Sequence, residues 1–215
     1  MKFLRKMVVA AAIVGSMIGA GAANAAIILG PPGSCGPNGC FAPAAVTTLL
    51  SSFTYIDFNA GLPGTYTGTG NLATGFNPGI WAQPLGDTSQ FLTVPGGASE
   101  TFTPGGLHNV FGLYWGSVDT YNSIDLFDGV NHFVFTGTDL FGICANGSQT
   151  AACSNQYVTF LGIPYISVTL ISSSNAFESD NHLVGDVPEP SSLALLAFAL
   201  LGLFGWGHLS QRRRA

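Results

Sequence analysis

Four oxygen-bearing side chains could together hold a hard cation. Asp57 falls in an early apolar run, and Glu178, Asp180 and Asn181 stand together near the end of the chain's body. Carboxylate and amide oxygens suit Ca²⁺, which takes roughly six to eight oxygen ligands. The sequence has no D-x-D-x-D-G loop, the motif of a dedicated calcium site. We therefore predict that the protein requires no cofactor, and that these four side chains could at most hold a structural Ca²⁺. The alternative is that these side chains are solvated turn residues.

Aromatic side chains next to amides could bind a sugar. Trp81 lies in a stretch rich in Pro and Gly, and Tyr121 precedes Asn122. Their rings would pack on the apolar face of a sugar while neighbouring amides and carboxylates bond its hydroxyls. We therefore predict that Trp81 and Tyr121 bind a glycan. The alternative is that they fill the core, as most aromatic side chains do.

A hydrolytic site is a further alternative, because Ser117, Asp119, His108 and His132 could form a nucleophile, a base and an orienting group. The sequence lacks the G-x-S-x-G turn that exposes such a serine. Residues 116–119 instead resemble a corner after a strand, where Ser and Asp bond to the backbone. We therefore predict no catalytic residue and a protein that is not an enzyme.

The charges are divided between the ends and the body. The six basic side chains are Lys2, Arg5, Lys6, Arg212, Arg213 and Arg214, and all 11 carboxylates fall between Asp57 and Glu189. The body is therefore a polyanion without Lys or Arg. Nucleic-acid binding is excluded, because it depends on Lys and Arg contacts to phosphates. A Walker-type phosphate loop, which needs a Lys, is excluded as well.

The N-terminus has the pattern of a secretory signal. The basic start precedes an apolar run from Met7 to Ala20, and small residues follow to Ala25. We predict a signal peptide over residues 1–25, which signal peptidase removes. A permanent membrane anchor is the alternative, although the run is short and rich in Ala and Gly. The mature protein is therefore expected outside the cytoplasm.

The C-terminus has the pattern of a membrane helix with a stiff segment before it. Residues 192–209 are apolar and long enough to cross about 27 Å of hydrocarbon as a helix. Arg212, Arg213 and Arg214 follow at once and place this end in the cytoplasm. Pro188 and Pro190 keep the segment before the helix extended. Glu189 then stands just outside the membrane, where a processing enzyme can reach it.

These three parts, Val187-Pro188-Glu189-Pro190, a single apolar helix and an Arg-rich end, resemble the PEP-CTERM sorting signal over residues 187–215. The resemblance implies that exosortase, a membrane-embedded enzyme, reads and processes the tail. It also implies a Gram-negative bacterium that makes extracellular polysaccharide. The protein would pass through the inner membrane and end at the cell surface or in the extracellular matrix.

Four cysteines in an exported chain are expected to form disulfides, and three pairings are possible. The spacing favours the two local pairs, Cys35 with Cys40 and Cys144 with Cys153. A zinc site is the alternative, but the spacing is not that of a zinc knuckle.

The body, residues 26–186, shows short alternating runs between clusters of Gly, Asn and Pro. An antiparallel β-sandwich follows, with an Asp128-Gly129 hairpin turn. Alternation places Phe111, Leu113 and Trp115 on one core-facing side of their strand; Ile124, Leu126, Phe133 and Phe135 follow the same rule. The strands are predicted at residues 53–58, 91–94, 101–103, 110–115, 123–127, 132–136, 156–161, 166–172 and 182–184.

Residues 111–124 and 175–181 resemble the extracellular domain of a PEP-CTERM subgroup with a jelly-roll-like sandwich. Three functions remain open. The first is a surface or matrix protein without enzymatic activity that binds extracellular polysaccharide. The second is a calcium-stabilised, lectin-like carbohydrate-binding module. The third is a secreted hydrolase.

Overall fold

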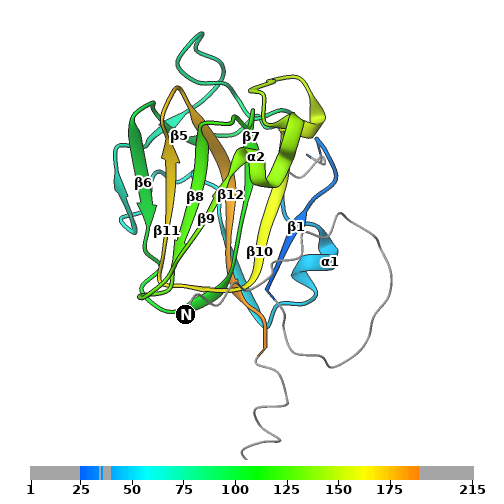
Figure 1. The fold of residues 1–215 in the computed structure, drawn as a ribbon, viewed down its shortest axis with the longest axis vertical. Helices are drawn as coiled ribbons and strands as arrows, with labels where there is room; N and C mark the ends of the chain where they lie inside the picture. Colours follow the sequence, from blue (N-terminus) through cyan, green and yellow to red (C-terminus); the bar gives the residue numbers. More distant parts are fainter. Residues whose placement is uncertain (1–24, 34, 36–39, 189–215) are drawn as a thin grey trace, which may run out of the picture. The chain divides into compact units, whose positions relative to one another are not determined.

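The computed structural model describes residues 25–33, 35 and 40–188 (Figure 1). The predicted signal peptide, apart from Ala25, lies outside the described residues. So do Glu189, Pro190, the predicted helix 192–209 and Arg212, Arg213 and Arg214. Within the described ranges, no helix has both the length and the apolar character needed to cross a bilayer.

The described chain forms two antiparallel sheets that make a β-sandwich (Figure 1). The first sheet has seven strands: β1 (Ala26–Leu29), β2 (Ser52–Ile56), β4 (Asn71–Ala73), β5 (Phe91–Val94), β7 (His108–Gly116), β10 (Gln156–Tyr165) and β12 (Phe177–Asp186). The second has five: β3 (Tyr66–Gly68), β6 (Ala98–Phe102), β8 (Asn122–Phe127), β9 (His132–Thr136) and β11 (Ser167–Ser172). Short helical turns connect them: α1 (Ala44–Thr47), α2 (Gly137–Phe141), η1 (Gly142–Cys144) and η2 (Ala152–Ser154).

The strand order brings distant parts of the sequence together. The first sheet runs β1-β10-β7-β12-β5-β4, and the second runs β3-β6-β11-β8-β9. One edge of β12 pairs with β7. Its other edge is divided between β5, which pairs with Phe177–Ser179, and β2, which pairs with His182–Asp186. Strand β12, from the end of the body, is therefore central to the larger sheet.

The predicted Asp-Gly hairpin is confirmed between β8 and β9. Ser123 lies opposite Thr136, and Phe127 lies opposite His132. Asp128 closes the turn, because its Oδ1 accepts the backbone N–H groups of Val130 at 2.8 Å and Asn131 at 2.6 Å. Gly129 has φ of 101°, which favours a residue without a side chain.

Alternation also predicted the core faces correctly. The main hydrophobic cluster lies between the sheets and contains Phe111, Leu113 and Trp115 from β7. It also contains Ile124, Leu126 and Phe135, and Phe133 packs against it. Trp115 stacks on Phe177 of β12, with ring centroids 4.4 Å apart. Core filling is therefore the role of Trp115, as the period of two indicated.

A second hydrophobic cluster covers the other face of the first sheet. It contains Cys40, Ala42, Val46, Val110, Tyr114, Tyr157, Leu183 and Val187. The segment after β1 and helix α1 supply its outer layer. Because the centre of this sheet is covered on both faces, its strands do not need to alternate apolar and polar residues.

This burial on both faces explains the main error in the predicted strands. We predicted the last strand over residues 182–184 only, whereas β12 runs from Phe177 to Asp186 and is buried at its first nine positions. Its polar residues find partners inside the protein, so their hydrophilic pattern wrongly indicated a loop. Strands β1, β3 and β4 were missed; runs of three or four residues show a period only weakly, although β5, also of four residues, was predicted with its observed bounds.

Candidate functional site

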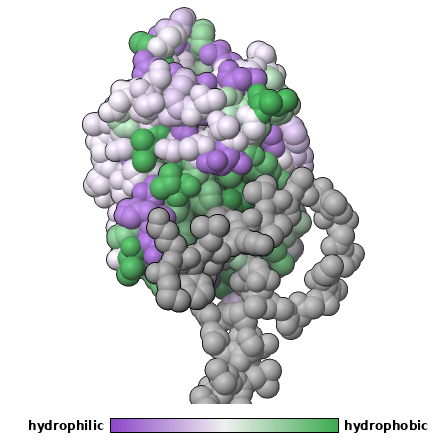
Figure 2. Space-filling model, in the orientation of Figure 1, coloured by the Kyte–Doolittle hydropathy of each residue, from purple (hydrophilic) through white to green (hydrophobic). Residues whose placement is uncertain are grey.

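A cavity of about 230 Å³ opens where β7 ends and β12 begins. Its walls come from four separate segments, residues 79–82, 117–121, 146–149 and 175–178. Both side chains predicted to bind a glycan, Trp81 and Tyr121, line it. On the face shown in Figure 2, this end of the sandwich, at the top of the view, carries mainly hydrophilic and neutral residues among single hydrophobic ones.

The loop that carries Trp81 is held at both sides. The backbone N–H of Ala82 donates to Glu178 Oε1 at 3.0 Å, and Asn175 Nδ2 donates to the carbonyl of Gly79 at 3.2 Å. Within the loop, Trp81 N–H donates to the carbonyl of Asn77 at 3.1 Å. The indole Nε1 of Trp81 is buried and has no hydrogen-bond partner among the described residues. A donor without a partner is costly when buried, and this one belongs to a side chain that lines the cavity.

Glu178 lines the cavity and is only 3% exposed. Its Oε2 accepts a hydrogen bond from Ser117 Oγ at 2.9 Å, in addition to the bond that Oε1 accepts from Ala82 N–H. Burial, helped by the nearby charge of Asp119, raises the pKa of Glu178 to about 8, although these two hydrogen bonds act to lower it. Glu178 therefore holds a proton at neutral pH.

Asp119 lines the same cavity and is partly exposed. Burial raises its pKa, while the nearby Tyr121 hydroxyl lowers it. Gly147 approaches the carboxylate closely: a Cβ placed there would lie 2.5 Å from Asp119 Oδ1. The Tyr121 hydroxyl donates its proton to the carbonyl of Asn175 at 2.6 Å. Asp119 and Tyr121 thus lie on neighbouring parts of the cavity wall.

Both predicted disulfides are confirmed, Cys35 with Cys40 and Cys144 with Cys153. The second closes the loop that carries Asn146, Gly147 and Gln149 into the cavity wall. Buried Asn155 follows this loop and ties three segments together. Its Oδ1 accepts from Ser117 N–H at 2.9 Å and from Leu85 N–H at 3.1 Å, while its Nδ2 donates to the carbonyls of Ser148 and Ala151.

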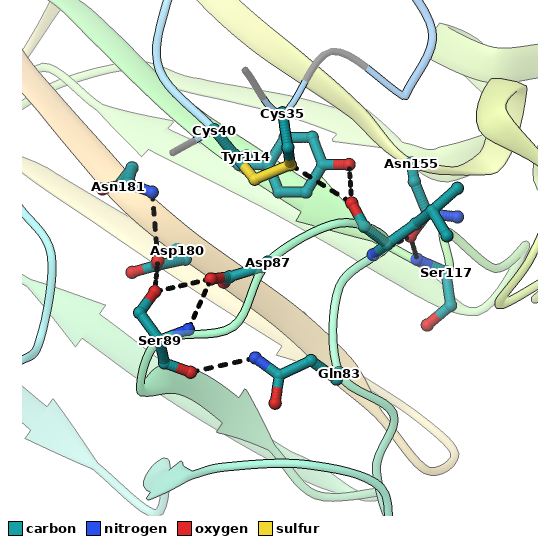
Figure 3. The surroundings of a disulfide bond; sticks show 11 residues. Cys35, Cys40, Gln83, Asp87, Ser89, Tyr114, Ser117, Asn155, Asp180 and Asn181 are labelled. Carbon is teal, nitrogen blue, oxygen red and sulfur yellow. Dashed lines mark hydrogen bonds between the residues drawn. A yellow bond between two sulfur atoms is a disulfide. The ribbon is translucent and has the colours of Figure 1, made fainter. Parts of the chain in front are cut away.

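Asp180 lies outside the cavity in a separate buried network (Figure 3). Ser89 Oγ lies 3.0 Å from Asp180 Oδ2 and 2.5 Å from Asp87 Oδ1, and Asn181 Nδ2 donates to Asp180 Oδ2 at 3.0 Å. Burial, and then the charge of Asp87, raise the pKa of Asp180 to about 8. Asp180 Oδ1 and Asp87 Oδ2 are buried and have no donor among the described residues. A proton held on Asp180 removes its repulsion with Asp87.

The structure does not bring the four residues of the predicted calcium site into one cluster. Asp57 is exposed, and its carboxylate bonds Asn59 in its own turn. Glu178 and Asp180 belong to the two separate networks described above. In residues 25–33, 35 and 40–188, no group of three or more His, Cys, Asp or Glu side chains is arranged to hold a metal ion. The structural Ca²⁺ stays a prediction, now without a defined ligand set.

The residues of the hydrolytic alternative are also far apart. His108 Nδ1 lies 3.0 Å from Asp186 Oδ2 at the start of β7, whereas Ser117 follows the end of this nine-residue strand. At about 3.3 Å per residue, the two are roughly 30 Å apart. His132 pairs with Asp125 in the second sheet, at 2.7 Å. Ser117 donates to Glu178 and has no histidine beside it in the described structure.

Sequence reasoning did not foresee that Glu178 lines the same cavity as Trp81 and Tyr121, or that Asn146 and Gln149 contribute to it. One feature of the sequence did indicate that these segments belong together. The two segments that resemble the jelly-roll subgroup, residues 111–124 and 175–181, meet at the cavity through the bonds from Ser117 to Glu178 and from Tyr121 to Asn175.

Comparison with known protein families identifies the C-terminal segment. Residues 186–214 match the family described as the PEP-CTERM protein-sorting motif. The chain carries a PEP-CTERM sorting motif. The motif implies export, processing by exosortase and a final place at the cell surface or outside the cell. Val187 and Pro188, the described part of the motif, leave the sandwich directly after β12. The Val187 backbone is held there by Asn109, whose Oδ1 accepts Val187 N–H at 2.8 Å.

The body that precedes the sorting motif has distant structural similarities. One is to a structure described as "The complexity of the Ruminococcus flavefaciens cellulosome reflects an expansion in glycan recognition", with 18% identity over 66% of this chain and 99% of that chain and a TM-score of 0.36. Another is to the catalytic domain of a GH87 alpha-1,3-glucanase in complex with tetrasaccharides, with 16% identity over 63% of this chain and 28% of that chain and a TM-score of 0.38. Similarities this low carry no information about function. No curated protein matches the sequence.

Proposed function

We propose that this exported surface protein binds extracellular polysaccharide through the cavity at the end of β7, and that it does so without catalysis. The observation that carries the proposal is the combination of two aromatic side chains, Trp81 and Tyr121, with carboxyl and amide groups in one cavity of about 230 Å³. The cavity is somewhat smaller than the ~300–1,000 Å³ of sites for drug-sized ligands. It therefore suits a single sugar residue, at the end of a chain or on a branch.

The chemistry of the lining matches that of a sugar. The apolar face of a pyranose packs on an aromatic ring, and its hydroxyls need both donors and acceptors. Asp119 offers acceptors, and the exposed amide of Gln149 offers donors and acceptors. The lining therefore supplies both kinds of contact that a sugar needs.

The hydrogen bonds of Glu178 also agree better with a binding role for the cavity than with a catalytic one. Both of its carboxyl oxygens already have partners, Ala82 N–H and Ser117 Oγ, which join the Trp81 loop to the end of β7. We therefore assign Glu178 to holding the cavity together. In the cell, we place the protein at the surface or in the matrix of a Gram-negative bacterium, after signal peptidase and exosortase have acted at the inner membrane.

Replacing Trp81 by Ala tests the proposal. We expect the variant to lose about tenfold or more in affinity for the polysaccharide of the producing cell, because it loses the aromatic surface on which the sugar packs. Affinity is measured by isothermal titration calorimetry with oligosaccharides released from that polysaccharide. Phe76→Ala is the matched control, since Phe76 lies in the same connection between β4 and β5, is 58% exposed and does not line the cavity. Equal affinities of Trp81→Ala and the wild type would reject the cavity as the binding site.

A further inference from the structure

The only charge that the lining of the cavity carries is negative. It belongs to Asp119, because the Glu178 carboxyl holds a proton at neutral pH. None of the lining residues is Lys, Arg or His. No Lys or Arg occurs anywhere between Met7 and Gln211. The histidines of the described body are occupied elsewhere: His108 with Asp186, His132 with Asp125, and buried His182 with Tyr66 and Ser179. The protein therefore supplies no cation to balance a carboxylate in this cavity.

Asp119 is the side chain through which this charge acts. It is partly exposed and lines the cavity, whereas the carboxyl of Glu178 is buried with both oxygens bonded. Its burial is incomplete, so a ligand atom can reach the carboxylate. A donor carrying a positive charge forms a stronger hydrogen bond to a carboxylate than a neutral hydroxyl does. An anionic ligand would instead face Asp119 with no compensating cation.

The aromatic part of the cavity favours the same kind of ligand. The face of a Trp ring attracts a cation that lies against it, and Trp81 is in the wall of the cavity. The exposed amide of Gln149 in the same wall offers a neutral donor and a neutral acceptor as well, and an ammonium group alone cannot use the donor. A ligand that satisfies both must carry a positive charge and oxygen atoms on one small frame.

We propose that the cavity recognises a hexosamine residue with a free, protonated amine, and that it excludes sugars bearing carboxylate, pyruvate or sulfate groups. The inference deepens the proposed glycan-binding function and rests on it. The ammonium group bonds Asp119, the sugar oxygens accept from the Gln149 amide, and the ring packs against the aromatic wall. Partly deacetylated amino-sugar polymers are the class of polysaccharide that presents such residues.

Four tetrasaccharides of matched length test the inference by calorimetry at neutral pH. They are β-1,4-linked glucosamine, its N-acetylated form, β-1,4-linked glucose and α-1,4-linked galacturonate. We expect glucosamine to bind about tenfold or more tightly than the two neutral oligosaccharides, and galacturonate not to bind. Spermidine serves as a fifth ligand that has the charge but no sugar, and we expect it to bind at least tenfold more weakly than the glucosamine tetramer.

Asp119→Asn removes the charge and keeps the size of the side chain. We expect this variant to bind the glucosamine tetramer about tenfold more weakly, with an unchanged affinity for the neutral tetramers. Asp57→Asn makes the same change of charge on an exposed turn outside the cavity and should bind like the wild type. Thermal unfolding of each variant establishes that it is folded.

The outcomes separate the two proposals. If a neutral oligosaccharide or galacturonate binds as tightly as glucosamine, the amine preference is wrong and the glycan-binding cavity stands. Equal loss in Asp57→Asn and Asp119→Asn, or tight binding of spermidine, also overturns the inference, because the attraction would then come from the general negative charge. If neither these tetramers nor the oligosaccharides from the producing cell bind, both proposals fall.

Discussion

At the scale of single residues, the described body has carboxyl groups where a core usually has apolar side chains. Glu178 is 3% exposed and Asp180 is fully buried, both on β12. Neither has a Lys or Arg to pair with, so the protein neutralises them with protons and hydrogen bonds. Because these protons are bound in the folded state, the stability of the fold depends on pH.

The direction of this dependence follows from the two pKa values. Glu178 and Asp180 both have a pKa of about 8 in the folded protein, against 4.5 and 3.8 ordinarily. From about pH 4 to about pH 8, the folded state holds protons that the unfolded chain has released. The free energy of unfolding therefore falls as the pH rises through this window, by up to ~1.4 kcal/mol per pH unit for each group.

Urea unfolding at a series of pH values measures this slope. We expect Glu178→Gln and Asp180→Asn each to make the decline shallower, because an amide has no proton to lose there. Asp57→Asn, on an exposed turn, should retain the slope of the wild type. If both Glu178→Gln and Asp180→Asn show the same change of unfolding free energy with pH as the wild type, the raised pKa values are not the cause of the pH dependence.

At the scale of elements, the cavity depends on the loop closed by the Cys144–Cys153 disulfide. Gly147 in this loop has φ of 69° and bonds the carbonyl of Val118 through its N–H at 2.9 Å. The loop thereby comes close enough to touch the carboxylate of Asp119. A glycine is needed here for two reasons: the backbone is left-handed, and a side chain would collide with the Asp119 carboxylate.

Gly147→Ala should push Asp119 out of place, because its Cβ would lie 2.5 Å from the carboxylate oxygen. We expect a loss of stability of about 1–2 kcal/mol and a loss of glycan affinity of about tenfold or more. Gly142→Ala is the matched control: Gly142 has φ of 55°, and nothing lies within 4 Å of a Cβ placed there. This control also places an alanine at a positive φ, and it should keep its affinity. Equal affinity losses in the two variants would show that strain, rather than displacement of Asp119, is the cause.

At the scale of the whole molecule, the basic residues lie only in the two end segments that export is expected to remove. Without residues 1–25 and the Arg-rich end, the chain has no Lys or Arg. The mature protein then carries a strongly negative charge at neutral pH, which disfavours contact with anionic surfaces and anionic polymers. This charge agrees with a preference for amino sugars over acidic ones.

The intact mass of the protein recovered from cells and medium tests the processing. We expect the N-terminus at Ala26 and a C-terminus that lacks Arg212, Arg213 and Arg214. Trypsin should leave this species uncut even after reduction and alkylation, because it has no Lys or Arg. A recovered surface form that begins at Met1 and ends at Ala215 would be incompatible with the predicted route.

The sequence alone determined the features that depend on local pattern. The sorting motif, both disulfide pairings, the Asp128-Gly129 hairpin and the core faces of β7, β8 and β9 follow from residues close together in the chain. Each is specified by spacing, by composition or by a period of two, which a sequence displays directly. Trp81 and Tyr121 were found in the same way, from their neighbours, before anything placed them in one cavity.

Only the tertiary structure decided which polar residues work together. Glu178 and Asp180 are two residues apart on β12, yet the first joins a cavity with Trp81 and Asp119 while the second joins Asp87 and Ser89. Their partners come from loops up to about 100 residues away in the chain. Such pairings depend on strand order and on how loops close over a sheet. Neither of these produces a periodic pattern in the sequence from which it could be predicted.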